Sequence, residues 1–202
     1  MSRIRNIVML CVWMVGVTLV YAGEIVVPLA DRGMVSDQGT CNFHYKSALA
    51  GRDHGIYRNF FVFDLKQLSS QQVVTAATVI MEHPAWGYSS PDGHETFVLH
   101  AVNLDIENIS SNLLYGALAS GPEIGRGTVS NTIAATTLSI PVNAAGIEFL
   151  TQCRGGTATF GGEVVSLTDE SDVTECLFRF VNPKTLGPGD NRIVLQFLDS
   201  AP

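Results

Sequence analysis

The feature that most constrains the fold is an aromatic and β-branched run at residues 57–65, with the sequence YRNFFVFDL. Successive side chains of a β-strand point to opposite faces. We expect one face of this run in a core, since it carries mostly apolar side chains: Tyr57, Asn59, Phe61, Phe63 and Leu65. The other face holds Phe60 and Val62 between two charges, so we expect another segment to cover part of it. A strand that is apolar on both faces lies inside a sheet and not at its edge.

Short apolar runs separated by turn-forming residues continue along the chain, which predicts a protein built mostly of strands. The further strands are expected at residues 23–29, 73–82, 95–102, 127–130, 136–142, 157–160, 164–167, 176–181 and 192–198. Residues 31–33 predict a turn, and residues 34–55 a long polar loop with one short strand near Tyr45. Helices are expected at residues 109–119 and 144–152, the second capped by Asn143. This pattern predicts an all-β fold, a β-sandwich of jelly-roll type with one or two short helices.

Residues 1–22 have the layout of a secretory signal peptide. Two arginines precede an apolar run at residues 7–20, and a small-residue pattern ends at Ala22. The run is short for a transmembrane helix, and an uncleaved anchor is the alternative. We expect cleavage, a secreted (extracellular or periplasmic) protein, and one β-sandwich domain over residues 23–202.

The charge balance argues against two classes of partner. The formal net charge is −7, and removing residues 1–22 leaves ten basic against 19 acidic side chains, a net charge of −9. An acidic domain without a basic stripe is repelled by nucleic acid and by anionic membrane surfaces. We therefore expect neither as a partner.

Three cysteines remain after residue 22, and an exported protein can form a disulfide bond. The sequence allows three single pairings among Cys41, Cys153 and Cys176, or three free thiols. We favour Cys153–Cys176, because both lie in the second half of the chain and flank two predicted strands. Cys41 would then be left over.

The Pro84 to Gly93 segment is a loop dense in turn formers, and it is the candidate ligand site. A flat aromatic ring beside polar hydrogen-bonding groups is the usual device for holding a sugar. The segment and its neighbours supply both, and the expected ligand-binding residues are Trp86, Tyr88, Asp92 and Glu95. In the alternative interpretation, Trp86 and Tyr88 fold back and cover the end of the sandwich.

The sequence contains no motif that is typical of a catalytic site, and only loop carboxylates suggest a metal site. The sequence has no G-x-S-x-G elbow, phosphate loop or H-E-x-x-H motif, so we expect no enzyme. Loop carboxylates can instead hold a structural calcium ion through oxygen ligands. The candidates lie in the polar N-terminal part of the chain: Asp31, Asp37 and Asp53. We expect no other cofactor.

Four segments, in chain order, carry a family likeness. They are residues 57–65, residues 76–80, the GYSSPD loop at 87–92 with residues 95–97, and residues 160–162 leading to 176–178. In these segments the chain resembles bacterial secreted β-sandwich proteins of the group associated with PEP-CTERM sorting tails. That group is similar to jelly rolls of the carbohydrate-binding-module type and, more distantly, to DNRLRE-type domains.

The resemblance implies a β-sandwich but no defined activity, and no catalytic residue comes with it. The chain departs from the group at residues 198–202, which lack the Pro-Glu-Pro sorting motif, so we expect simple secretion. The predicted function is a secreted, non-catalytic module that binds a glycan or the extracellular matrix. The alternative is a structural envelope or matrix protein that acts through protein–protein contacts. The expected partner is accordingly an extracellular polysaccharide or an envelope protein.

Overall fold

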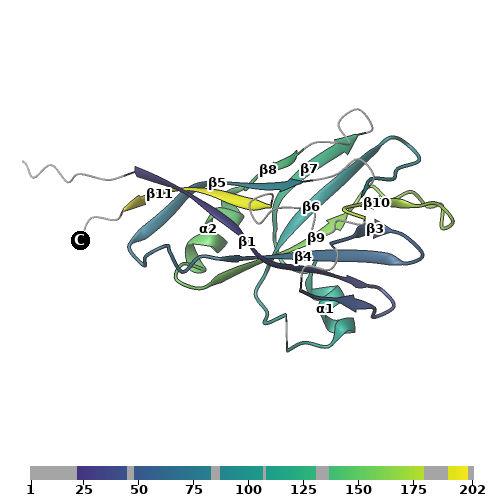
Figure 1. Ribbon diagram of the computed structural model, residues 1–202, viewed down its shortest axis with the longest axis horizontal. Helices are drawn as coiled ribbons and strands as arrows, with labels where there is room; N and C mark the ends of the chain where they lie inside the picture. The colour runs from purple at the N-terminus through teal and green to yellow at the C-terminus, as the bar shows by residue number, and fades with distance from the viewer. Residues whose placement is uncertain are drawn as a thin grey trace, which may run out of the picture.

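The computed structural model describes residues 22–44, 48–82, 87–106, 108–130, 137–179 and 191–199. This part of the chain forms eleven antiparallel strands and two short helices (Figure 1), which confirms the all-β prediction. The strands are β1 (Ala22–Ser36), β2 (Cys41–Asn42), β3 (Ala50–Arg52), β4 (Ile56–Asp64), β5 (Gln72–Glu82), β6 (His94–Val102), β7 (Glu123–Ser130), β8 (Thr137–Pro141), β9 (Thr157–Val164), β10 (Glu175–Leu177) and β11 (Arg192–Asp199). The helices are α1 (Ser111–Ala117) and α2 (Ala144–Gln152).

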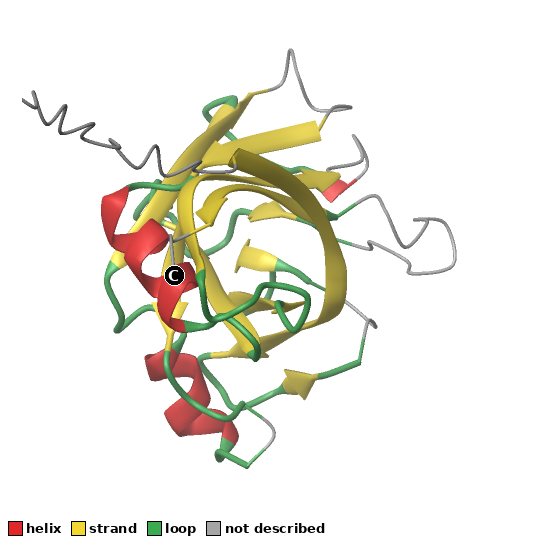
Figure 2. Ribbon diagram, turned by 90° about the vertical axis from the view of Figure 1, so that its left-hand side faces the viewer, coloured by secondary structure: helices red, strands yellow, loops and turns green. Residues whose placement is uncertain are grey.

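The strand order is β7-β6-β9-β4-β1-β11-β5-β8, with β2, β3 and β10 attached beside this path. The sheet curls until it is nearly a barrel (Figure 2), a shape compatible with an all-β sandwich. The curl depends on β1, because its first half pairs with β11 and its second half pairs with β4. A bulge between Leu29 and Asp31 marks the change of partner. Bulges of this kind let one strand pass from one sheet into another.

The long β1 corrects two predictions. Residues 31–33 do not turn but continue the strand, because their backbone pairs with residues 60–62 of β4. Within the expected loop at residues 34–55, two short strands form, β2 and β3. Tyr45, where a strand was expected, lies outside the described residues.

The run at residues 57–65 forms β4, which lies between β1 and β9, as expected for an internal strand. Phe61, Phe63 and Leu65 are buried in the main core between the faces of the curled sheet. On the opposite face, Phe60 is also fully buried, in a second cluster beneath α1 with Leu114 and other residues. The prediction that another segment covers part of this face is confirmed.

β5 has the predicted position but not the predicted alternation throughout. Ala77, Val79 and Met81 are buried as expected, whereas Val73 is exposed and Val74 is buried instead. The pairing with β11 shifts between Gln196 and Phe197, which leaves one extra residue in β5. A bulge of one residue reverses the side on which the following side chains point.

Two adjacent glycines in β9 allow close packing on both faces of the sheet. A Cβ at Gly161 would collide with the backbone carbonyl of Leu118, just after α1, on the outer face. A Cβ at Gly162 would collide with the side chains of Asn59 and Phe97 on the inner face. The FGG sequence at residues 160–162 is therefore needed for packing.

The second helix, α2, has the predicted bounds and the predicted cap. The side chain of Asn143 accepts a hydrogen bond of 3.0 Å from the backbone N–H of Gly146. Phe149 and Leu150 of this helix pack into the main core. Such a cap satisfies one of the free N–H groups in the first turn of a helix.

The predicted Cys153–Cys176 disulfide bond is wrong, because Cys41, Cys153 and Cys176 are all free thiols. Cys153 follows α2, whereas Cys176 is buried in β10. The proposed signal peptide lies outside the described residues, apart from Ala22, which begins β1. No helix among the described residues is long and apolar enough to span a membrane.

Candidate functional site

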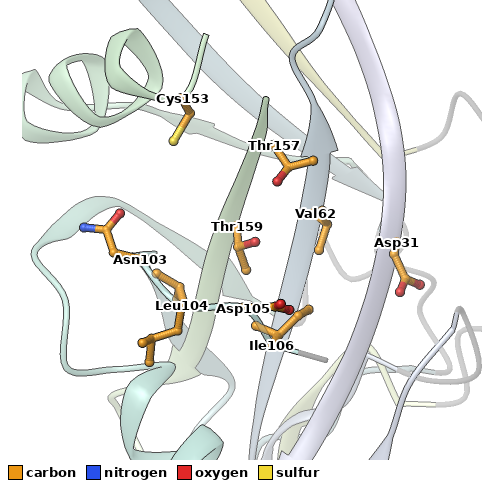
Figure 3. A pocket seen from close by; sticks show the side chains of 10 residues that line it. Asp31, Val62, Asn103, Leu104, Asp105, Ile106, Cys153, Thr157 and Thr159 are labelled. Carbon is orange, nitrogen blue, oxygen red and sulfur yellow. The ribbon is translucent and has the colours of Figure 1, made fainter. Parts of the chain in front are cut away.

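A hollow of the described surface lies on the outer face of β4 and β9, away from the main core. Its volume is about 620 Å³, and we call it the outer pocket (Figure 3). Figure 3 shows side chains from β1, β4, β9, the loop after β6 and the end of α2 around it. The lining residues are Asp31, Val62, Val102, Asn103, Leu104, Asp105, Ile106, Cys153, Thr157 and Thr159.

The floor of the outer pocket is one row of residues that crosses four strands. Asp31 of β1 lies opposite Val62 of β4, which lies opposite Thr159 of β9, which lies opposite Val102 of β6. The row faces outward because its neighbours along the strands, such as Phe61 and Phe160, point into the main core. The alternation that builds the core thus also builds the pocket.

One wall of the outer pocket is the loop that follows β6. Ile106 is buried in the second cluster, so it fixes the loop against the sheet. Asp105 accepts a hydrogen bond of 2.7 Å from the side-chain amide of Asn108. Leu104 remains 48% exposed and gives the wall an apolar surface. The pocket therefore combines acidic, polar and apolar groups.

Three polar side chains in the outer pocket have no partner among the described residues. Thr159 is only 8% exposed, yet its hydroxyl makes no hydrogen bond within the described part of the chain. Thr157 and Asn103 likewise keep their side-chain groups free of described partners. None of these three groups is among the fully buried polar atoms without a partner, so they are open to the pocket and available to hydrogen-bond a ligand.

The acidic and sulfur groups of the outer pocket differ in character. Asp31 accepts a 2.8 Å hydrogen bond from the backbone N–H of Arg32, and its other oxygen lies 3.4 Å from Nδ1 of His44. Burial raises the pKa of the Cys153 thiol. A raised pKa keeps cysteine in its less reactive thiol form.

The predicted glycan loop is only partly described, since Trp86 lies outside the described residues. Tyr88 is half-buried and packs against the main core, and burial raises the pKa of its phenol. Asp92 accepts hydrogen bonds from the Ser90 hydroxyl at 2.7 Å and from the His94 N–H at 3.2 Å. These bonds stabilise a local turn of the exposed loop.

Glu95, the fourth residue predicted at that site, is fully buried. One of its oxygens accepts a hydrogen bond from Ser166, and the other has no hydrogen-bond partner among the described residues. Burial raises the pKa of this carboxyl. The structure therefore places Glu95 in the interior, whereas Asp92 is on the surface.

The three aspartates proposed as calcium ligands are not brought together. No group of three or more metal-binding side chains occurs among the described residues. Asp31 faces the outer pocket, Asp37 accepts a hydrogen bond from the Ile56 N–H, and Asp53 forms an ion pair of 2.8 Å with Arg179. Each carboxylate thus has its own local neighbour.

A second polar cluster, outside the outer pocket, joins the sheet to α1. Arg58 contacts Glu163 at 2.9 Å, donates a 2.8 Å hydrogen bond to the carbonyl of Tyr115, and lies 4.3 Å from the centre of its ring. His100 contacts the other oxygen of Glu163. These bonds fix α1 against the sheet, and this structural role is enough to explain the cluster.

Of the residues that line the outer pocket, the sequence interpretation singled out two: Asp31, assigned to a metal, and Cys153, assigned to a disulfide bond. It missed Asn103, Asp105, Thr157 and Thr159. A partial signal was present, because Thr157 and Thr159 alternate with core residues along β9, so they had to face outward. Nothing local indicated that the loop after β6 would return over that face.

No protein-family model matches the chain, and no curated protein matches it.

Proposed function

We propose that the protein is a secreted, non-catalytic module that binds a glycan in the outer pocket. The observation that carries this proposal is Thr159, a largely buried residue that lines the pocket and whose hydroxyl has no described partner. Sugars present many hydroxyl groups that both donate and accept hydrogen bonds, and so they match hydroxyl, amide and carboxylate groups. Leu104 and Val62 add apolar surface for the C–H face of a sugar ring.

A binding role suits this pocket better than catalysis. Its described lining residues include no histidine, and burial raises the pKa of the thiol that they do include, that of Cys153. A nucleophile paired with a base is the usual arrangement in covalent catalysis, and the lining residues do not supply one.

The test is a glycan array followed by calorimetric titration of the glycans that bind. Thr159→Val keeps the side-chain shape and removes the hydroxyl, so the dissociation constant should rise about fivefold. Thr128→Val is the matched control, because Thr128 lies on β7, away from the pocket, and is exposed. It should leave binding unchanged. Failure of the wild-type protein to bind any glycan ends the proposal.

The loop predicted from the sequence can be tested in the same experiment. If Trp86→Ala and Tyr88→Ala abolish binding while Thr159→Val leaves the dissociation constant unchanged, the glycan site lies in the loop and not in the outer pocket. Weaker binding in Thr159→Val alone assigns the site to the pocket.

One observation favours the alternative function, a structural protein that acts through protein contacts. Val73 and Leu198 lie opposite each other on β5 and β11, and they are 42% and 37% exposed. Neighbouring exposed apolar side chains are typical of contact surfaces when they belong to a larger patch. Analytical ultracentrifugation of wild type and Val73→Lys would test this. A monomer at all concentrations argues against self-association.

A further inference from the structure

A second, smaller hollow adjoins the outer pocket. It has a volume of about 370 Å³ and is lined by residues 27–30 of β1 together with Asp64, Lys66 and Gln67. Asp64 lies directly opposite Thr157, which lines the outer pocket. Ala30 of the smaller hollow immediately precedes Asp31 of the larger one. The two hollows are therefore neighbours at β1 and β4, and we call them together the groove.

The groove has a surplus of negative charge. Asp31 and Asp105 line the outer pocket, and no lysine or arginine is among its described lining residues. The basic group described beside Asp31 is the imidazole of His44, at 3.4 Å. In the smaller hollow, Asp64 is paired with Lys66 at 3.2 Å. A ligand with anionic groups, such as a uronic acid or a sulfated sugar, would be repelled here, whereas an ammonium group would be attracted.

We propose that the groove binds an extended polymer of amino sugars with free, protonated amino groups. This inference rests on the proposed glycan-binding function and names its ligand class. Ammonium groups of the polymer pair with Asp31 and Asp105, while its ring hydroxyls bind the free groups of Thr157, Thr159 and Asn103. A basic peptide offers the ammonium groups but not the ring hydroxyls.

The experiment is calorimetric titration of the purified protein with four hexamers. These are the hexamers of glucosamine, of N-acetylglucosamine, of glucose (cellohexaose) and of lysine. The glucosamine hexamer should bind about tenfold more tightly than the N-acetylated one, since acetylation removes the charge. It should also bind more tightly than the glucosamine dimer, which cannot occupy both hollows. Asp31→Asn and Asp105→Asn should each remove most of the preference for the charged sugar.

Asp169→Asn is the control for overall charge, because Asp169 is exposed and has no described partner. An equal loss of binding in this variant would overturn the proposal in favour of unspecific attraction. Tighter binding of the lysine hexamer would overturn it in favour of a basic peptide. Equal or tighter binding of the N-acetylated or neutral sugars would overturn it while the proposed glycan-binding function remains. Absence of binding to every glycan would overturn both. A melting curve for each variant establishes that it is folded.

Discussion

The imidazole of His100 lies between two acceptors: its Nε2 is 3.1 Å from Oε1 of Glu163, and its Nδ1 is 3.0 Å from the carbonyl oxygen of Gly121. Only the doubly protonated ring can donate to both. The hydrogen bond with Glu163 raises the pKa of His100, and the bond with His100 lowers the pKa of Glu163. The charged pair thus joins β6 to β9 on the side of the sheet that carries α1.

The first prediction is that this pair makes stability depend on pH. The raised pKa of His100 means that its contribution is complete below the unfolded-state pKa of histidine and is lost as the pH rises through the folded-state value. We expect wild type to be about 2 kcal/mol more stable than His100→Gln near pH 6. This advantage should shrink steadily up to pH 9. Thermal melting of both proteins across that range gives the answer, and a constant difference contradicts the prediction.

The contribution of Glu163, the carboxylate of the same pair, can be tested separately. The lowered pKa of Glu163 stabilises the fold above the unfolded-state pKa of glutamate, and this contribution is lost as the pH falls through the folded-state value. Glu163→Gln should therefore be less stable than wild type at pH 6. The difference should diminish below pH 4, as measured by urea unfolding. A difference that persists in acid would argue against the pair as its cause.

Glu95 is expected to destabilise the fold at high pH. Burial raises the pKa of the Glu95 carboxyl, because the interior favours its neutral form. The stability that the neutral form retains is complete below the unfolded-state pKa of glutamate, and it is lost as the pH rises through the folded-state pKa of Glu95. Glu95→Gln removes the charge and should raise the unfolding free energy by about 1 kcal/mol or more at pH 8. The gain should vanish at low pH.

Glu175→Gln is the matched control, since Glu175 is equally buried but forms a 2.8 Å ion pair with Arg52. It should destabilise the protein by about 3 kcal/mol, because it leaves the charge of Arg52 without its carboxylate partner. The two substitutions therefore have opposite predicted signs. Chemical unfolding of both variants at pH 8 measures them, and equal signs would refute the distinction.

Gly161→Ala should destabilise the protein, because its Cβ would collide with the carbonyl of Leu118 and displace the end of α1. Overpacking of this kind costs about 1–3 kcal/mol. Gly116→Ala, within α1, is the control, since no atom lies within 4 Å of the added Cβ. That change should stabilise by about 0.5–1 kcal/mol, because alanine favours helix. Melting temperatures that fall for both variants would contradict this account.

Much of the fold was predictable because its signals are local. The alternation at residues 57–65 identified an internal strand, and Asn143 identified the start of α2. The alternation of β5 failed only before its bulge, since a bulge depends on the pairing with β11. The turn expected at residues 31–33 failed for a similar reason, because the second half of β1 is set by β4.

The sequence by itself determined an all-β protein with its main strands and its aromatic core, because these depend on the period of two along a strand. Only the tertiary structure decided where the candidate site lies. Asp31, Val62, Thr159 and Val102 are far apart in the sequence, and strand register alone places them in one row. It also decided that Glu95 is buried while Thr159 faces a hollow, since burial depends on which segment covers a side chain.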